Sequence, residues 1–151
     1  MEYATQENFE KIKSAFKRNI EILGFVHPLG IKKYIEDKKV IYQNNVILIT
    51  TKYKTNRTIS NEIRAVKGNF MVNYIINDGA EKGATSIVFQ EFLKTIDSSI
   101  FAEIRTDNIL SIQFFKRNGF IEIGEKKVGK NKDIILKIYK LEIDTWSKWM
   151  N

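Results

Sequence analysis

The chain of 151 residues contains no cysteine, one histidine and one proline. The absence of cysteine excludes a thiol nucleophile, a disulfide framework and a thiolate zinc site. The single histidine, His27, argues against a His-based metal site, which needs at least two such ligands. We therefore predict no metal centre. If the protein is an enzyme, its acid and base must be Glu, Asp, Tyr or Lys side chains, or water held by the backbone.

Long apolar runs are also absent. No stretch of about 18 apolar residues predicts a transmembrane helix. The first residues, MEYATQENFEK, are polar and lack the hydrophobic region of a signal peptide. We therefore expect a soluble, cytoplasmic protein with no membrane partner.

The composition is that of a globular protein, with 43% apolar and 28% charged residues. The length suits one ordinary domain, and no Pro/Gly/Ser linker interrupts it, so we predict a single domain over residues 1–151. The formal net charge of +7 suggests an anionic cofactor, a nucleic acid or an acidic partner. Because the lysines are scattered along the chain, ordinary surface solubility is the alternative interpretation.

Hydrophobic periodicity predicts the elements. Apolar residues at helical spacing predict a helix over residues 6–23 after a Thr5 cap, and Pro28 suits the first position of a second helix that ends at Lys38. Further helices are expected at 83–96, with Ile87 on its apolar face, and from the Asn108 cap to about 118. Residues 55–60 suggest a loop. Strands are predicted at residues 40–43, 46–53, 70–76, 100–105, 120–127 and 133–143, the first two joined by Asn44-Asn45. This alternation implies an α/β fold with a mixed sheet and helices on both faces.

The segment 75–89, IINDGAEKGATSIVF, runs from a strand through a glycine-containing loop into a helix. Unpaired N–H groups at a helix N-terminus favour a phosphate or pyrophosphate. Gly83 would let the backbone come close, Thr85 and Ser86 could add hydroxyl donors, and Lys82 supplies a positive charge. A glycine before a helix is also ordinary turn chemistry.

A second motif lies in residues 102–120, AEIRTDNILSIQFFKRNGF. It resembles the GNAT (acetyl-CoA-dependent N-acetyltransferase) pattern Glu-Val-Arg-x-x-Asn-x-x-Ala-x-x-Phe-Tyr-x-x-x-Gly-Phe, in the form closest to ribosomal-protein alanine N-acetyltransferases. The resemblance spans about residues 6–143. It implies a mixed, mostly antiparallel central sheet flanked by helices on both faces. It also implies acetyl transfer from acetyl-CoA to a primary amine of a small molecule, peptide or protein.

The resemblance also assigns the cofactor contacts. GNAT proteins carry Arg/Gln-x-x-Gly-x-Gly/Ala at the pyrophosphate loop, and in residues 80–85 of this chain only the first glycine matches. Ala80 and Thr85 depart from the pattern, and Glu81 adds a negative charge. Pantetheine would pair with the backbone near residues 75–77, in a slot where strands 70–76 and 100–105 splay apart. The implied cofactor-binding residues are Ile75, Ile76, Asn77, Lys82, Gly83, Ala84, Thr85, Ser86, Asn108, Phe115 and Lys116.

Glu103 is the implied catalytic residue. A glutamate inside an apolar strand would be partly desolvated, which suits a general base. The resemblance gives it the same role, taking a proton from the acceptor ammonium group. The alternative is a surface ion pair, for instance with Arg105. Phe115 stands where the family has a tyrosine that protonates the departing CoA thiolate, and Tyr74, Tyr139 or water could substitute.

Other features leave alternatives open. His27 and Tyr74 are candidates for contacts with the acceptor. Trp146 and Trp149 share one helical face that could pack on the sheet or on a partner in a homodimer. Lysines at residues 126–127 and 130–132 are expected at a hairpin tip, as solvated surface or as a site for an acidic or nucleic-acid partner. The alternative functions are an inactive GNAT-fold module that binds acyl-CoA or nucleic acid, and a GNAT-like enzyme that modifies nucleic acid.

Overall fold

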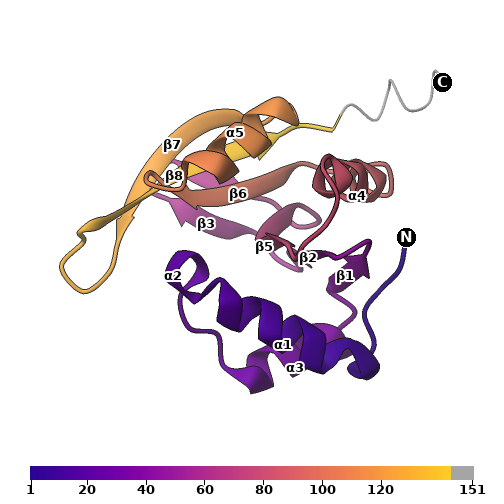
Figure 1. Ribbon diagram of the computed structural model, residues 1–151. Helices are drawn as coiled ribbons and strands as arrows, with labels where there is room; N and C mark the ends of the chain where they lie inside the picture. The colour runs from indigo at the N-terminus through magenta and orange to yellow at the C-terminus, as the bar shows by residue number, and fades with distance from the viewer. Residues whose placement is uncertain (144–151) are drawn as a thin grey trace. The chain divides into compact units, whose positions relative to one another are not determined.

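The computed structural model describes residues 1–143 and contains a six-stranded sheet with the strand order β1-β2-β5-β6-β8-β7 and a separate β3-β4 hairpin (Figure 1). The sheet is mostly antiparallel, with a parallel pair between β5 and β6. These features confirm the predicted fold class. The elements in chain order are η1 (Gln6–Asn8), α1 (Phe9–Arg18), α2 (Ile20–Leu23), α3 (Pro28–Glu36), β1 (Val40–Gln43), β2 (Val46–Lys52), β3 (Arg57–Ser60), β4 (Ile63–Ala65), β5 (Phe70–Asn77), α4 (Ala84–Leu93), β6 (Ile100–Arg105), α5 (Ile109–Arg117), β7 (Ile121–Val128) and β8 (Ile134–Leu141).

The chain forms two compact units. Unit 1 consists of Met1–Thr50 and Asn73–Phe92, and unit 2 consists of Thr51–Val72 with the described residues from Leu93 onward. That residues 1–151 make one domain stays a prediction.

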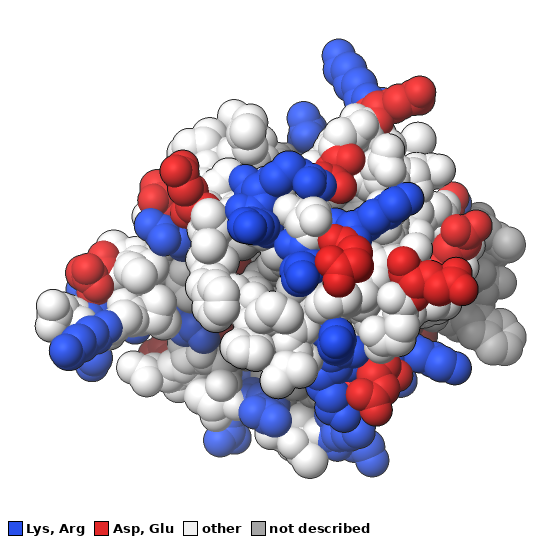
Figure 2. All heavy atoms as spheres, turned by 60° about the horizontal axis from the view of Figure 1, so that its bottom comes forward, with Lys and Arg blue, Asp and Glu red and all other residues white. Residues whose placement is uncertain are grey.

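In unit 1, the helices form where the sequence predicts them, with one interruption. The predicted helix over residues 6–23 is broken at Asn19, whose side-chain Nδ2 donates to the Ala15 carbonyl at 2.7 Å. Pro28 occupies the first turn of α3 as predicted, since its missing N–H is not needed there. The side on which Figure 1 shows these helices carries both basic and acidic side chains among uncharged surface (Figure 2).

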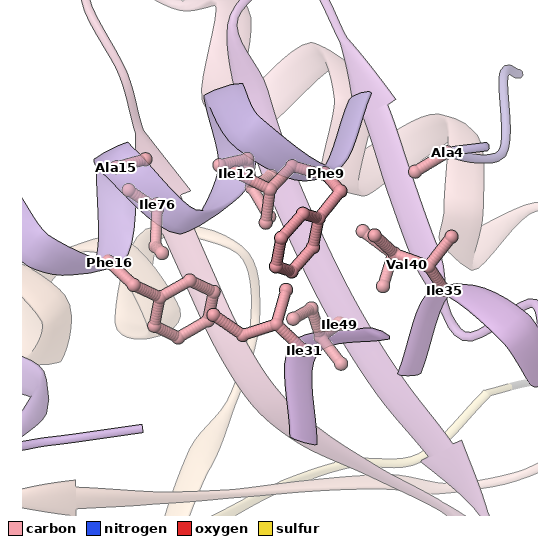
Figure 3. Packing of buried hydrophobic residues seen from close by; sticks show 11 residues of the cluster. Ala4, Phe9, Ile12, Ala15, Phe16, Ile31, Ile35, Val40, Ile49 and Ile76 are labelled. Atoms are coloured by element: carbon pink, nitrogen blue, oxygen red, sulfur yellow. The ribbon is translucent and has the colours of Figure 1, made fainter. Parts of the chain in front are cut away.

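The core of unit 1 lies between the helices α1 and α3 and one face of the strands (Figure 3). Phe9, Ile12 and Phe16 of α1 pack against Ile31 of α3 and Ile49 of β2. Alternate residues of β2 face the other way because side chains alternate along a strand. On that side lies α4, whose Val88 and Phe89 are fully buried (Figure 1). Helices therefore cover both faces of these strands.

Two local predictions in unit 1 have clear outcomes. The turn Asn44-Asn45 is confirmed, with φ of 52° and 60°, the left-handed values that a tight hairpin requires. The prediction for Ile87 is wrong, because its side chain is 58% exposed and Phe89 is buried in the helix instead. Before α1, Tyr3 makes an isolated antiparallel bridge with Ile41, so the N-terminal segment adds one bridge beside β1.

Unit 2 contains β6, β7 and β8 and the paired start of β5. The parallel pairing joins Phe70–Val72 to Ile100–Ala102, while β5 continues to Asn77 and β6 to Arg105. Strand β8 pairs antiparallel with β6 along the whole length of β6, and β7 pairs with β8.

Unit 2 also contains a hairpin that the sequence analysis missed. Residues 55–60 were expected to be a loop, but Arg57–Ser60 forms β3 and pairs with β4. Ile59 packs in a cluster with Phe101 and Ile138. A methyl group on Gly124 would lie 2.6 Å from Ile63 Cδ1, so the hairpin lies directly against β7 at this point.

The predicted position of Lys126 and Lys127 at a hairpin tip is wrong. Both lysines lie within β7, not at the hairpin tip, and Lys126 is engaged in an ion pair described below. The predictions for Trp146 and Trp149 fall outside the described residues.

Candidate functional site

The loop between β5 and α4 has a defined conformation in unit 1. The Asn77 side-chain Oδ1 accepts the Ala80 N–H at 2.7 Å, and the Ala84 N–H donates to the Glu81 carbonyl at 3.0 Å. Gly83 has φ of +86°, which only glycine adopts without strain. The Ile87 N–H donates to the Gly83 carbonyl at 3.1 Å as the first bond of the helix. The glycine in the pattern therefore sits at the helix cap.

The first turn of α4 supplies hydrogen-bond donors. The N–H groups of Thr85 and Ser86 precede that of Ile87, the first donor of the helical ladder, so they have no partner inside the helix. The Thr85 Oγ1 is buried and is the one buried side-chain oxygen or nitrogen without a hydrogen bond in residues 1–143. An orphaned hydroxyl beside free helix donors fits an anionic ligand group.

An open hollow of about 420 Å³ lies beside this loop. Its lining comes from the β1–β2 turn and from the loop and first turn of α4: Asn44, Asn45, Gly79, Glu81, Lys82, Ala84 and Ile87. Glu81 and Lys82 are both exposed and bring opposite charges to its edge. The guanidinium of Arg18 forms an ion pair with Asp78, next to the loop.

Glu103 lies in unit 2 on β6. Its carboxylate Oε1 is 2.7 Å from Lys126 Nζ, and the two side chains are 23% and 27% exposed. Lys126 also donates to the Ile59 carbonyl of the β3-β4 hairpin at 3.4 Å. Arg105 pairs with Asp107 instead, with its Nη2 2.9 Å from the Asp107 carboxylate. The expected partial burial of Glu103 is confirmed, and its ion-pair partner is Lys126.

Tyr53 is a neighbour that sequence reasoning missed. Its pKa is raised, chiefly by burial and then by the negative charge of Glu103, while Arg57 opposes the shift. The ring packs at the edge of the cluster formed by Phe101 and Ile138. No signal in the local sequence joins positions 53 and 103.

Helix α5 carries three of the residues implied by the resemblance. Asn108 is confirmed as the cap, because its Oδ1 accepts the Ser111 N–H at 3.3 Å. Phe115 is 3% exposed, and its ring lies edge-on to Phe114 and Phe120 with centroids 5.3 and 5.0 Å away. Lys116 is exposed.

The two tyrosines named as substitutes for the acid missing at Phe115 lie in different units. Tyr139 in unit 2 is buried, and its hydroxyl lies 3.5 Å from Glu122 Oε1. Burial first, and then the charge of Glu122, raises its pKa. Tyr74 in unit 1 packs edge-on to Phe16 at 4.9 Å, and burial followed by the neighbouring Tyr34 raises its pKa.

The remaining residues of the predicted site lie in unit 1. His27 caps α3, since its Nδ1 accepts the Leu29 N–H at 3.1 Å. Ile76 is buried in the core of the unit, and Ile75 is partly buried. Within residues 1–143 no three His, Asp or Glu side chains gather as metal ligands, and no helix has the length and apolar character to cross a membrane.

Comparison with known proteins gives no sequence match: neither a protein-family model nor a curated protein matches the chain. Solved structures do match. The ribosomal-protein-S18-alanine N-acetyltransferase of Escherichia coli has a TM-score of 0.63 at 12% identity, covering 94% of this chain and 92% of the other. The ribosomal-protein-alanine N-acetyltransferase of Brucella melitensis has a TM-score of 0.68 at 13% identity, covering 93% and 98%.

A third similar structure, from Salmonella typhimurium, contains its cofactor acetyl-CoA. Its TM-score is 0.71 at 13% identity, and the match covers 94% of this chain and 92% of the other. Structural similarity at identities this low establishes the fold, and the activity must be argued from the residues. The chain has the fold of the GNAT N-acetyltransferases, as the motif in residues 102–120 implied.

Proposed function

We propose that the protein transfers an acetyl group from acetyl-CoA to a primary amine of a small molecule, peptide or protein. The observation that carries the proposal is the cap of α4, where Gly83 at positive φ opens a helix whose first turn borders a polar hollow. The GNAT fold and the sequence pattern around Glu103 support the same conclusion. The two units contribute different parts of the function.

In unit 1, the N–H groups of Thr85 and Ser86 and the Thr85 hydroxyl would bind the pyrophosphate of acetyl-CoA. Lys82 adds a positive charge, and Glu81 opposes it. The backbone of residues 75–77 would pair with the amides of pantetheine. The buried, unpaired Thr85 Oγ1 is the observation that makes these residues fit such a group.

In unit 2, Glu103 would accept a proton from the acceptor ammonium group, directly or through water. Acetyl-CoA supplies a thioester, whose carbonyl carbon the neutral amine attacks. The new C–N bond forms as the C–S bond breaks, the CoA thiolate leaves, and the nitrogen gives up its second proton to water to become the neutral amide. Lys126 would hold the carboxylate of Glu103 in one orientation through the 2.7 Å contact.

Phe115 cannot donate a proton to the leaving thiolate, because its buried ring carries no hydroxyl. A thiol with a pKa near 8.5, the value of cysteine, leaves tolerably without an acid. We therefore assign the final protonation of CoA to water. Loss of a general acid typically costs about 10²–10⁴-fold in rate, so slow turnover is expected.

The test is release of free CoA from acetyl-CoA in the presence of a panel of amines, followed with a thiol reagent. Because the chain contains no cysteine, the protein contributes no thiol signal of its own. Amine-dependent release is the expected result. The absence of release with every amine, despite saturable binding of acetyl-CoA, contradicts the proposal.

A second candidate function is a GNAT-fold module that binds acyl-CoA without turnover. Two observations favour it: Phe115 offers no proton, and the carboxylate of Glu103 is already engaged by Lys126. It predicts that Glu103→Gln and the wild type bind acetyl-CoA equally and that neither releases CoA. Measured side by side, binding and release separate the two functions.

A further inference from the structure

A second hollow in unit 1 shares no lining residue with the hollow beside the Gly83 loop. It has a volume of about 300 Å³ and lies among α1, α2, the segment that follows them, and α3. Phe16 and Ile31, both almost fully buried, belong to its lining, as do the exposed Ile20 and Phe25. This volume is at the lower end of the range for pockets that bind small molecules.

The local sequence builds this hollow. Asn19 ends α1, and Gly24 ends the short helix α2 with φ of +76°, a value that favours glycine. The chain then passes through Phe25 and Val26, which also belong to the lining, before His27 starts α3. The Phe25 ring stands edge-on to the His27 ring with centroids 6.2 Å apart.

Apolar side chains around the hollow are exposed to an unusual extent. Phe25 is 75% exposed and Ile20 is 45% exposed, and the neighbouring Ile22 and Leu29 are 57% and 66% exposed. Single exposed apolar residues are common, but several within one short segment mark a surface that binds something apolar.

The charges at the hollow have one sign. Lys13 and Lys17 lie one helical turn apart on α1 and line it, and none of the lining residues found in the described part of the chain is acidic. Lys13 pairs with Glu10 at 3.3 Å, an acid whose side chain is 76% exposed. Lys17 is exposed and has no ion pair among residues 1–143.

We propose that this hollow binds an apolar carboxylate, a small molecule with a hydrocarbon or aromatic body and one carboxylate group. The apolar walls of Phe16, Phe25 and Ile31 would take the body, and Lys17, with Lys13, would take the carboxylate. Two cations without an acidic lining residue select an anion over a cation of the same shape. The site lies wholly in unit 1, and none of its lining residues is among those assigned above to acetyl-CoA.

The experiment is isothermal titration calorimetry on the full chain with decanoate, decanol and decylamine, each below its micelle concentration, and with phenylbutyrate as an aromatic acid. We expect saturable binding of at least one of the two acids, weaker binding of decanol, and weakest binding of decylamine. Lys17→Gln should weaken acid binding about two- to fivefold, the range for one exposed ionic contact. It should leave decanol binding unchanged.

Matched controls separate the site from general effects. Phe25→Ser changes an exposed side chain, so the fold should survive, and it should weaken the binding of acid and decanol together. Leu110→Ser also replaces an exposed apolar side chain with serine, at a position in unit 2 that is 80% exposed. It should change the binding of neither the acid nor decanol. Lys11→Gln removes one charge from the same helix outside this lining and should leave acid binding intact.

Three results would overturn the proposal. The first is that neither acid binds saturably. The second is that decanol binds as tightly as the acids and that Lys17→Gln has no effect on either, because the carboxylate would then contribute nothing to binding. The third is a concentration-dependent dimer, measured by sedimentation, that Phe25→Ser dissociates, because then a second copy of the chain covers the hollow.

Discussion

Replacing Glu103 with glutamine removes a proton acceptor while keeping the shape of the side chain. If Glu103 accepts the proton of the acceptor amine, its loss lowers kcat by about 10²–10⁴-fold, the usual contribution of a general base. At about 1.36 kcal/mol per tenfold change in rate, this raises the barrier by roughly 3–5 kcal/mol.

The same substitution also breaks the ion pair with Lys126, and the structure sets the size of that effect. Fully exposed pairs contribute about 0.2–1 kcal/mol, and removing one partner of a buried pair costs about 3–5 kcal/mol. The side chains of Glu103 and Lys126 are 23% and 27% exposed, between these cases. We therefore expect Glu103→Gln and Lys126→Gln each to lower the free energy of unfolding by about 1–2 kcal/mol.

The assay combines urea unfolding with CoA release for the wild type, both single variants and the double variant. Coupling between the two residues should appear as non-additive free energies of unfolding. Lys126→Gln keeps the carboxylate, so it should retain most of the turnover, whereas Glu103→Gln should not. Glu122→Gln is a matched control, since Glu122 lies in the same unit with its carboxylate 3.4 Å from Lys137 Nζ.

Turnover of Glu103→Gln at the wild-type rate would contradict the role of Glu103 as the base. An equal loss of turnover in Glu122→Gln and Glu103→Gln would contradict it too, since the loss would then follow from any broken ion pair in the unit. Additive free energies of unfolding for Glu103 and Lys126 would contradict the stabilising role of their contact.

The remaining predictions concern the cofactor loop and the tyrosines. Gly83→Ala places a methyl group in open space, but φ of +86° should cost about 1–2 kcal/mol in urea unfolding and weaken acetyl-CoA binding. Glu81→Gln removes a negative charge beside the loop and should tighten acetyl-CoA binding about two- to fivefold in calorimetry, more at low salt. The pKa values of Tyr53, Tyr74 and Tyr139 are raised above their ordinary value near 10. Their contribution to stability is therefore complete below pH 10 and lost as pH rises through the folded values, which urea unfolding and tyrosinate absorbance should follow together.

Each of these predictions has a contradicting result. Unchanged unfolding of Gly83→Ala would mean that the cap conformation is wrong. A Glu81→Gln variant that binds acetyl-CoA as the wild type does, even at low salt, would remove the loop from the cofactor site. Titration of all six tyrosines together at their ordinary pKa would contradict the burial of these three rings.

Much of the fold could be predicted because the pattern of apolar residues is strong where the chain is buried on one or both faces. Strand 100–105 and the cap at Asn108 were predicted at the residues where they occur. The hairpin of β3 and β4 could not be predicted, because Arg57 and Thr58 are exposed and only Ile59 of that strand is buried. A strand with one buried side chain carries almost no periodicity.

The surroundings of Glu103 were the least predictable part of the candidate site. The alternative interpretation of Glu103 named Arg105 as an example of an ion-pair partner, yet Lys126 reaches it from β7, across β8. The register aligns Glu103 with Gly124 through Ile138, two residues from Lys126. Neighbours of this kind depend on sheet order, which the local sequence does not encode. The loop at Gly83 was accessible to sequence reasoning because a cap depends on residues adjacent in the chain.

Transfer itself can be measured by mass spectrometry, with acetyl-CoA carrying an isotopically labelled acetyl group and a mixture of amines as acceptors. We predict an acetylated amine that carries the label, formed by the wild type and by Lys126→Gln but not by Glu103→Gln. Labelled acetyl-CoA that binds and is recovered intact, with no amine acquiring the label, would contradict the account.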